Sequence, residues 1–369
     1  MVLPQVPAPL WLKDRGPSDD VVVSSRCRLA RNLDGFPFPW RCTEYQLRRI
    51  AQAVVEAASL GPGAISEGIH VAVRQTTPEQ RAELVTMRYA TADWSNSTLE
   101  SYLIIGSDGA TSLLINEEDH VRLQTLLPGL QGDQCLDVAQ FELKRLSQSL
   151  RFAWKEGIGY LTASPANAGT GMRLSVLVQL MGLTQMGTLA QTLRAARDLG
   201  SAVRGVYGEN SRPIGALYQI SNGTSHGSSV ERWAARVSAT AAYLVEAERR
   251  ARMELYHGRA AKRDLADQAK QALELLFEGS VSTAELLWIA SLLRLAAFEG
   301  VISVDRREVE EWLAIAAAGL SIPAGSPAET AAERFDAIRY GAALRARMRA
   351  RERGTLPTTN AGLSGRTDM

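Results

Sequence analysis

The sequence predicts an α+β fold: an antiparallel sheet flanked by helices, followed by a smaller all-helical C-terminal domain. Three observations lead to this prediction. Two apolar, β-rich runs, 101–106 and 110–116, are joined by Ser107-Asp108-Gly109, and Asp-Gly at such a position is a strong hairpin signal. Amphipathic helical patterns alternate with β-rich runs as far as residue 258. From there on, only helical patterns occur.

The composition predicts a globular protein without a large charge imbalance. The chain has 369 residues, of which 46% are apolar, enough to build a sizeable core. Lys+Arg number 41 and Asp+Glu 40, so the overall charge suggests neither nucleic acid nor an anionic membrane as a partner. No window approaches eighteen uninterrupted apolar residues, and the three cysteines include no C-x-x-C pair. We therefore expect a cytoplasmic protein with reduced thiols.

Three regions are predicted along the chain. Residues 1–20 are rich in proline and turn formers and are expected to form an irregular N-terminal lead. Residues 21–258 carry the sheet and the candidate site, and 259–369 form the helical domain. This last region has no chemical motif of its own, so a packing or oligomerisation role is expected, and with it a homo-oligomer. Its arginine-rich tail, 333–353, is expected to be a solvated helix face.

The first expected strand follows Val21 and carries two arginines. A period of two places Arg26 and Arg28 on one face and Ser25, Cys27 and Leu29 on the other. Two guanidinium forks on one face suit a phosphate group. Two arginines on a strand also occur as ordinary surface residues, so this pattern alone leaves both interpretations open.

Most of the chemistry lies in the stretch 113–122, LLINEEDHVR. An apolar strand leads directly into Glu117, Glu118, Asp119 and His120, and Arg122 follows. Ionisable groups at the mouth of a buried strand are costly unless they meet partners or a charged ligand. The alternative is a solvated acidic turn after an edge strand.

The other elements follow from hydrophobic periodicity. Residues 43–59 predict an amphipathic helix with Thr43 as its N-cap, and a second helix is expected over about 78–90. A strand over 157–163 and a glycine-containing loop over 164–171 are expected to precede a helix that opens at 172–176, whose N-terminus would bind an anion. Further helices are expected over 136–154, 186–199, 228–257, 264–277, 283–298 and 306–318, and further strands over 202–207 and 216–221.

Five segments together resemble the ATP:guanido phosphotransferases, the phosphagen kinases and their bacterial protein-arginine kinase relatives. They are SSRCRLARNL (24–33), NEEDH with Arg122 (116–122), GYLTASPANAGTGMR (159–173), RGVYGE (204–209) and YQISN (218–222). Their order and spacing agree over about residues 20–255. The chain contains no G-x-x-x-x-G-K-[ST] and no HRD or DFG element, so neither a P-loop enzyme nor a eukaryotic-type kinase is predicted.

The resemblance implies a set of site residues. It implies Glu118 and Glu209 as the catalytic pair and Mg²⁺ bound through ATP, with no metal ligand from the protein. The implied residues for ATP and its phosphates are Ser24, Ser25, Arg26, Cys27, Arg28, Arg88, Arg122, Arg173, Leu174, Ser175, Val176, Leu177, Arg204, Gly205, Val206, Tyr207, Gly208 and Glu209.

Arg88, Ser164 and Ala166, which stands where the family usually has a threonine, depart from the family pattern. Arg88 lies where the family usually carries a nucleotide-contacting histidine; an arginine can stack on adenine or meet a phosphate, but it can equally be a surface residue. Ser164 replaces a cysteine that helps to orient the guanidinium in the family. We expect this replacement to affect the rate of the reaction or its dependence on ions, but not which reaction takes place.

The residues also account for the chemistry. A guanidinium has a pKa of about 12.5–13.8 and is a poor nucleophile. Two carboxylates, Glu118 and Glu209, can hold its planar fork in line with the γ-phosphoryl group, and a glutamate can accept the proton only as the N–P bond forms. The arginines match the charge that develops on the phosphoryl oxygens.

The sequence therefore predicts a protein-arginine kinase. Only 23 residues precede the Ser-x-Arg-x-Arg strand, where small-molecule phosphagen kinases carry a helical domain, and this favours the bacterial protein kinase branch. A kinase for free arginine and a phosphoarginine-binding adaptor without catalysis are the alternatives. The resemblance further implies a stress-response role, a heat-shock repressor and a Clp-type chaperone-protease as partners, and a phosphoarginine site at Asp336 and Arg339.

Overall fold

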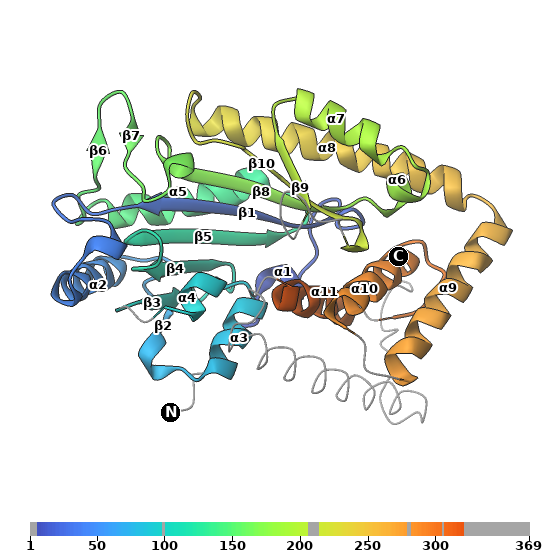
Figure 1. The fold of residues 1–369 in the computed structure, drawn as a ribbon, viewed down its shortest axis with the longest axis horizontal. Coiled ribbons are helices and arrows are strands. Elements are labelled where there is room, and N and C mark those ends of the chain that lie inside the picture. Colours follow the sequence, from blue (N-terminus) through green and yellow to red (C-terminus); the bar gives the residue numbers. More distant parts are fainter. Residues whose placement is uncertain (1–5, 98–99, 206–213, 279–281, 305, 321–369) are drawn as a thin grey trace, which may run out of the picture.

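The centre of the molecule is an eight-stranded antiparallel sheet. The computed structural model describes residues 6–97, 100–205, 214–278, 282–304 and 306–320. The strand order is β2-β3-β4-β5-β1-β8-β10-β9, and all pairs are antiparallel (Figure 1). In this order the strands are β2 (Ile69–Ala72), β3 (Tyr102–Ile105), β4 (Thr111–Ile115), β5 (Val121–Pro128), β1 (Val22–Arg31), β8 (Met172–Gln179), β10 (Leu217–Ser221) and β9 (Ala202–Gly205). This confirms the predicted α+β class.

Helices surround the sheet and cover one face of its central strands (Figure 1). In the described part of the chain they are α1 (Leu10–Lys13), α2 (Glu44–Ala58), α3 (Pro78–Thr86), α4 (Ala92–Ser95), α5 (Gly132–Leu146), α6 (Met181–Gln185), α7 (Leu189–Asp198), α8 (Val230–Tyr256), α9 (Arg259–Glu278), α10 (Thr283–Phe298) and α11 (Arg306–Leu320). Figure 1 shows α7 and α8 along one side of the sheet, α11 and α10 near α1, and α9 farther out beside α10. Short 3-10 turns lie at Pro39–Arg41, Val73–Gln75, Pro165–Asn167 and Ile214–Ala216.

The two faces of β1 differ as the period of two predicts. Ser25, Cys27 and Leu29 are buried, and the thiol of Cys135 in α5 donates a hydrogen bond to the backbone oxygen of Ser25 at 3.1 Å. The face with these residues therefore packs against α5. Arg26 and Arg28 point to the other face and are partly exposed.

Several elements confirm the sequence predictions. Thr43 caps α2: its hydroxyl accepts from the backbone N–H of Gln46, and Gln46 accepts from that of Thr43. The β3–β4 hairpin turns at Asp108, whose carboxylate accepts from the N–H groups of Ala110 and Thr111, each at 2.9 Å. β9 and β10 form the expected pair.

The expected helix after the glycine loop is wrong. Met172–Gln179 is the strand β8, which lies between β1 and β10 and is buried along almost its whole length. A short apolar run that is buried on both faces has no amphipathic period, so periodicity cannot separate a strand from a helix there. The anion site that we expected at a helix N-terminus is therefore absent at 172–176.

Three predicted boundaries also need correction. The helix expected over 136–154 is α5, Gly132–Leu146, and residues 154–155 belong to the small strand β6 (Trp154–Lys155). The strand expected over 157–163 is only β7 (Gly159–Tyr160), which pairs with β6. The helix expected over 78–90 ends at Thr86, because Arg88 adopts a left-handed conformation with φ 62°.

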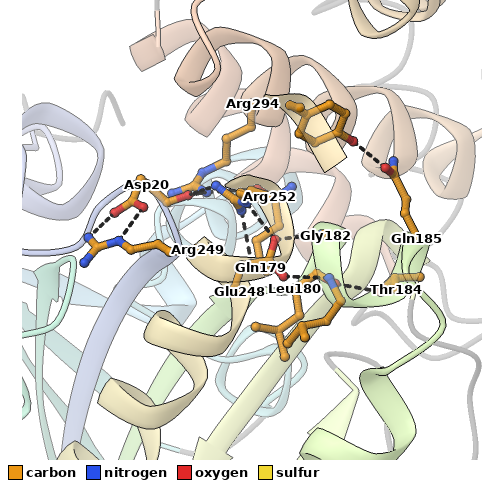
Figure 2. Close-up of polar contacts among 12 residues, drawn as sticks. Asp20, Gln179, Leu180, Gly182, Thr184, Gln185, Glu248, Arg249, Arg252 and Arg294 are labelled. Atoms are coloured by element: carbon orange, nitrogen blue, oxygen red, sulfur yellow. Dashed lines mark hydrogen bonds and ion pairs between the residues drawn. The ribbon is translucent and has the colours of Figure 1, made fainter. Parts of the chain in front are cut away.

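A buried network of charges attaches the C-terminal helices to the sheet (Figure 2). The guanidinium of Arg294 in α10 donates to the backbone oxygen of Asp20 at 3.1 Å and to the side-chain oxygen of Gln179 at 2.9 Å. It also forms an ion pair of 2.6 Å with Glu310 in α11. Asp20 precedes β1 and Gln179 ends β8, so α10 is fixed to the two central strands.

A second ion pair in this network lies wholly within the fold. Glu248 of α8 pairs with Arg252 at 2.6 Å, and it accepts hydrogen bonds from the N–H groups of Gly182 and Leu183 at the start of α6. Two buried charges of this kind are tolerated because each has several partners.

The predicted boundary at residues 258–259 falls between α8 and α9. Buried side chains of α10 and α11 belong to the same hydrophobic core as those of the sheet. None of the described helices combines the length and the apolar character needed to cross a membrane.

Candidate active site

Five arginines from four strands share one face of the sheet. The strand register pairs Arg28 of β1 directly with Arg173 of β8, and Ala30 with Arg122 of β5. Residues directly opposite each other in adjacent strands point to the same face. Arg204 of β9 lies on the same face through a series of pairs: it pairs with Gln219 of β10, Gln219 pairs with Leu177 of β8, and Leu177 pairs with Ser24 of β1. The residues of this arginine face are Arg26, Arg28, Arg122, Arg173 and Arg204.

The arginine face is electrostatically unfavourable without a ligand. Burial, together with the charges of Arg88, Arg122 and Arg173, lowers the pKa of Arg26 to about 9. Burial, with repulsion from other arginines, also lowers the pKa of Arg28. The Nε atoms of Arg28 and Arg173 are buried and have no hydrogen-bond partner among the described residues. Like charges opposite each other destabilise a sheet, so this arrangement fits a polyanion that satisfies both the charges and the free donors.

Arg88 lies beside this face, next to the start of β1. Its guanidinium is 3.4 Å from the hydroxyl of Ser24 and lies over the ring of Trp11, 4.5 Å from the ring centroid. Its charge acts on Arg26. The structure therefore brings Arg88 to the predicted site.

The acidic stretch 117–120 forms the loop between β4 and β5. Glu117 is buried and forms an ion pair with Arg122 at 2.5 Å, and it also accepts a hydrogen bond from Thr91. Asp119 is buried and accepts from the side chain of Asn32 at 2.5 Å. Burial lowers the pKa of His120 to about 4, so this ring is neutral at pH 7. Three of the four residues therefore stabilise the loop.

Glu118 differs from its neighbours because its side chain is exposed. Partial burial raises the pKa of its carboxyl group; Arg122 opposes this shift, and Asp119, Glu117 and Asp93 add to it. The charge of Glu118 also acts on Arg173. A solvent-accessible carboxylate thus lies within electrostatic reach of two members of the arginine face.

The loop that carries Ser164 is attached to this acidic stretch. The N–H of Ala163 donates to the Asp119 carboxylate at 2.7 Å, and the hydroxyl of Thr162 donates to the backbone oxygen of Ser164 at 2.7 Å. Just before the loop, the guanidinium of Arg31 lies 3.5 Å from the ring centroid of Tyr160. Ser164 is therefore placed at the same end of the sheet as Glu118.

Not every predicted residue directs its side chain toward the arginine face. Ser24, Ser175 and Leu177 share that face with the arginines. The side chains on the opposite face, against the helices, are those of Ser25, Cys27, Leu174 and Val176. Gly205 ends β9 next to Arg204. The predicted residues outside the described part of the chain are Val206, Tyr207, Gly208, Glu209, Asp336 and Arg339.

Sequence reasoning missed the residues that hold the functional side chains in place. Glu117 positions Arg122, and Trp11 lies under Arg88. The first, Glu117, could have been found from its position in the acidic run, two residues after the apolar strand ends. The second had no signal in the sequence, because 77 positions separate the two residues.

The donor set of this site fits a polyphosphate better than a bare metal ion. Among the described residues, no group of three or more His, Cys, Asp or Glu side chains could hold a metal. The buried, unpartnered guanidinium nitrogens are hydrogen-bond donors, which suit phosphate oxygens.

We expect thiol alkylation to leave the activity of the protein largely intact. Cys27 and Cys135 are fully buried, and burial raises the pKa of both thiols, to about 12 for Cys135. Only the partly exposed Cys42 is open to reagents, and burial raises its pKa as well. Mass spectrometry of the alkylated protein, with activity measured in parallel and Cys42→Ser as the control, checks this. Rapid inactivation from which ATP protects the protein would show that a thiol faces the site.

Comparison with known proteins gives a consistent result. The family model of the ATP:guanido phosphotransferase C-terminal catalytic domain matches residues 49–251. The protein-arginine kinase of Caldanaerobacter subterraneus is 37% identical over 289 residues, which cover 78% of this chain and 85% of that protein. The protein-arginine kinase of Symbiobacterium thermophilum is 36% identical over 309 residues, with 82% and 86% covered.

Solved structures with this fold were also found. A lombricine kinase matches with a TM-score of 0.55 at 23% identity, covering 67% of this chain and 72% of that chain. The duplicated taurocyamine kinase of Schistosoma mansoni, with bound transition-state analogue components, matches with a TM-score of 0.57 at 22% identity, covering 77% and 42%. At these identities the likeness establishes the fold alone.

Proposed function

This chain belongs to the ATP:guanido phosphotransferase family, and we propose that it is a protein-arginine kinase, which transfers the γ-phosphoryl group of ATP to arginine side chains of proteins. Relatives named protein-arginine kinase match over most of their own length. The observation that carries the proposal is the exposed carboxylate of Glu118 beside a face of five arginines.

The arginine face supports the binding of ATP. Arg26, Arg28 and Arg173 lie on adjacent strands, and together they present guanidinium groups that lack carboxylate partners in the described structure. Arg122 is already paired with Glu117, which fixes its orientation toward the same face. Binding of ATP phosphates would satisfy the buried donors and remove the repulsion. The nucleotide role of these residues and of Arg204 belongs to this proposal.

The chemical step follows from this arrangement. A terminal nitrogen of the substrate guanidinium attacks the γ-phosphorus, the bond to the β–γ bridging oxygen breaks, and ADP leaves with that electron pair. Glu118 orients the guanidinium and accepts the proton that the attacking nitrogen loses. Glu209 is proposed as the second carboxylate of the clamp. Well-aligned reactants recover on the order of 7–11 kcal/mol of barrier, so alignment is the larger contribution.

Further parts of the proposal concern cofactor and context. Mg²⁺ would be carried by the ATP phosphates, where it neutralises charge. We propose a cytoplasmic enzyme that acts in the stress response on protein substrates, with a heat-shock repressor and a Clp-type chaperone-protease as partners, and that forms a homo-oligomer. The support for these points is the resemblance, the balanced charge of the chain and the free cysteines of the described residues.

The deciding experiment incubates the pure protein with γ-labelled Mg·ATP and either an unfolded arginine-containing protein or free arginine. We expect acid-labile, base-stable label on the protein substrate and little on free arginine. Chelation of Mg²⁺ serves as the control and should abolish labelling. Label on free arginine alone would instead favour a small-molecule guanidino kinase, and no label with intact ATP binding would favour a binding protein without catalysis.

A further inference from the structure

The N-terminal lead contributes a buried aromatic side chain to the edge of the arginine face. Trp11 lies in the short helix α1 and is 3% exposed. Its ring lies under the guanidinium of Arg88, 4.5 Å from the ring centroid, and its indole N–H donates to the backbone oxygen of Met87 at 3.3 Å. Trp11 therefore contacts both Arg88 and Met87, the residue before Arg88.

The lead is attached to the same region by its backbone. The N–H of Leu10 donates to the backbone oxygen of Gly109 at 2.8 Å, in the turn of the β3–β4 hairpin. The hydroxyl of Tyr89 donates to the backbone oxygens of Pro7 at 3.1 Å and Gly109 at 3.0 Å. The chain just before Trp11 is thus attached to the hairpin turn and to Tyr89, and this attachment holds the Trp11 ring in place.

Arg88 itself is held in an unusual conformation. Its φ of 62° is uncommon for a residue with a side chain. The surroundings maintain it: the side chain of Gln124 donates to the backbone oxygen of Arg88 at 2.6 Å, and the N–H of Arg88 donates to Val85 at 2.9 Å. Backbone strain of this kind persists where the surrounding structure over-determines it, and it concentrates at functional sites.

The guanidinium of Arg88 is directed toward the arginine face. It lies beside Ser24 and close enough to Arg26 to lower the pKa of that residue by charge repulsion. The Trp11 ring offsets this repulsion, because the negative face of an indole attracts a cation.

We propose that Trp11 is a positioning residue for nucleotide binding: its ring holds the guanidinium of Arg88 against the arginine face, where Arg88 contacts bound ATP. This inference rests on the proposed function.

A double-mutant cycle on nucleotide affinity tests this pairing. The dissociation constant of a fluorescent ATP analogue is measured for wild type, Trp11→Met, Arg88→Ala and the double variant of the full chain. We expect each single variant to weaken binding about tenfold, within the range of a desolvated cation–π contact. The double variant should bind no more weakly than Arg88→Ala, and the steady-state kcat should change far less than the KM for ATP.

Two further variants separate positioning from general stability. Trp11→Phe retains an aromatic face but not the indole N–H, so we expect it to bind within about threefold of wild type and to have no effect in the Arg88→Ala background. If Trp11→Met does not fold, Trp11→Phe with and without Arg88→Ala tests the coupling instead. Trp233→Met removes another buried tryptophan, in α8, that lies 4.9 Å under Arg236. It should lower the thermal midpoint without changing the affinity for nucleotide.

The outcomes also separate this inference from the proposed function. Wild-type affinity in Trp11→Met, or losses that multiply in the double variant, would overturn the inference and leave the kinase activity standing. A wild-type protein that binds the analogue but labels no arginine would refute the proposed function, and the Trp11–Arg88 coupling would still be measured.

Discussion

Glu118→Gln lowers the rate of arginine phosphorylation by at least about a hundredfold while nucleotide affinity stays within a few fold of wild type: this is the largest effect that we expect from a single substitution. Glutamine keeps the size of the side chain but can neither accept the proton nor offer a charged partner to the guanidinium. A general base is worth about 10²–10⁴ in rate. Single-turnover labelling of a protein substrate, together with titration of an ATP analogue, measures the two quantities separately.

The exposed position of Glu118 makes this test clean. Among the described residues, its side chain has no fold-stabilising partner comparable to those of Glu117 and Asp119, which are buried and hydrogen-bonded. We therefore expect an unchanged thermal midpoint in Glu118→Gln and in Glu118→Ala. Glu274→Gln, on an exposed part of α9, is the matched control and should be fully active. Retention of more than about a tenth of the wild-type rate in both Glu118 variants would exclude the assigned role.

The same carboxylate sets an expected pH dependence. Partial burial and neighbouring acids raise the pKa of Glu118. A general base must be deprotonated, so kcat/KM falls as the pH drops through this pKa, and the acidic limb should lie above the ordinary glutamate value of about 4.3. His120 is not expected to produce that limb, because burial lowers its pKa to about 4. The measurement is a pH–rate profile, and the limb should disappear in Glu118→Gln.

The parts of the fold that the sequence predicted are those with local signals. The β3–β4 hairpin turns at Asp108-Gly109, and α2 begins at a capping residue, Thr43, so both were predicted with nearly correct bounds. β8 was mistaken for a helix because a central strand is buried on both faces. The site depended on the five motif segments, which place arginines from distant parts of the chain on one face.

The supports of the site could not be predicted from the sequence. The pairing of Trp11 with Arg88 and the network around Arg294 join positions that are far apart along the chain. Such contacts exist only after the sheet has formed and the helices have packed. They require the left-handed backbone at Arg88 and the contact of α10 with the residue before β1 and the last residue of β8, and no local pattern encodes either feature.

Arg26→Lys is expected to weaken ATP binding strongly although it retains the positive charge. Arg26 lies in the middle of β1 on the arginine face, where a planar guanidinium can donate two hydrogen bonds to a phosphate and an ammonium group cannot. Loss of one hydrogen bond to a charged group costs about 1.5–3 kcal/mol. At 1.36 kcal/mol per factor of ten, this is roughly tenfold to 150-fold in affinity. Isothermal titration with Mg·ATP measures it, with Arg263→Lys on the exposed side of α9 as the control.

Arg26→Met tests the same site through the thermal stability of the protein. It distinguishes arginines that bind a ligand from arginines that stabilise the fold. Burial and three neighbouring arginines lower the pKa of Arg26 to about 9, so Arg26 stays charged at pH 7 but its charge is less favourable in the folded protein than in the unfolded chain. Removal of that charge should raise the thermal midpoint of the nucleotide-free protein. ATP stabilises the wild type by RT ln(1 + [ATP]/Kd), and this increment should be nearly lost in Arg26→Met. If the substitution instead lowered the midpoint and left the ATP-induced shift intact, the arginines would serve the fold, and the nucleotide would bind elsewhere.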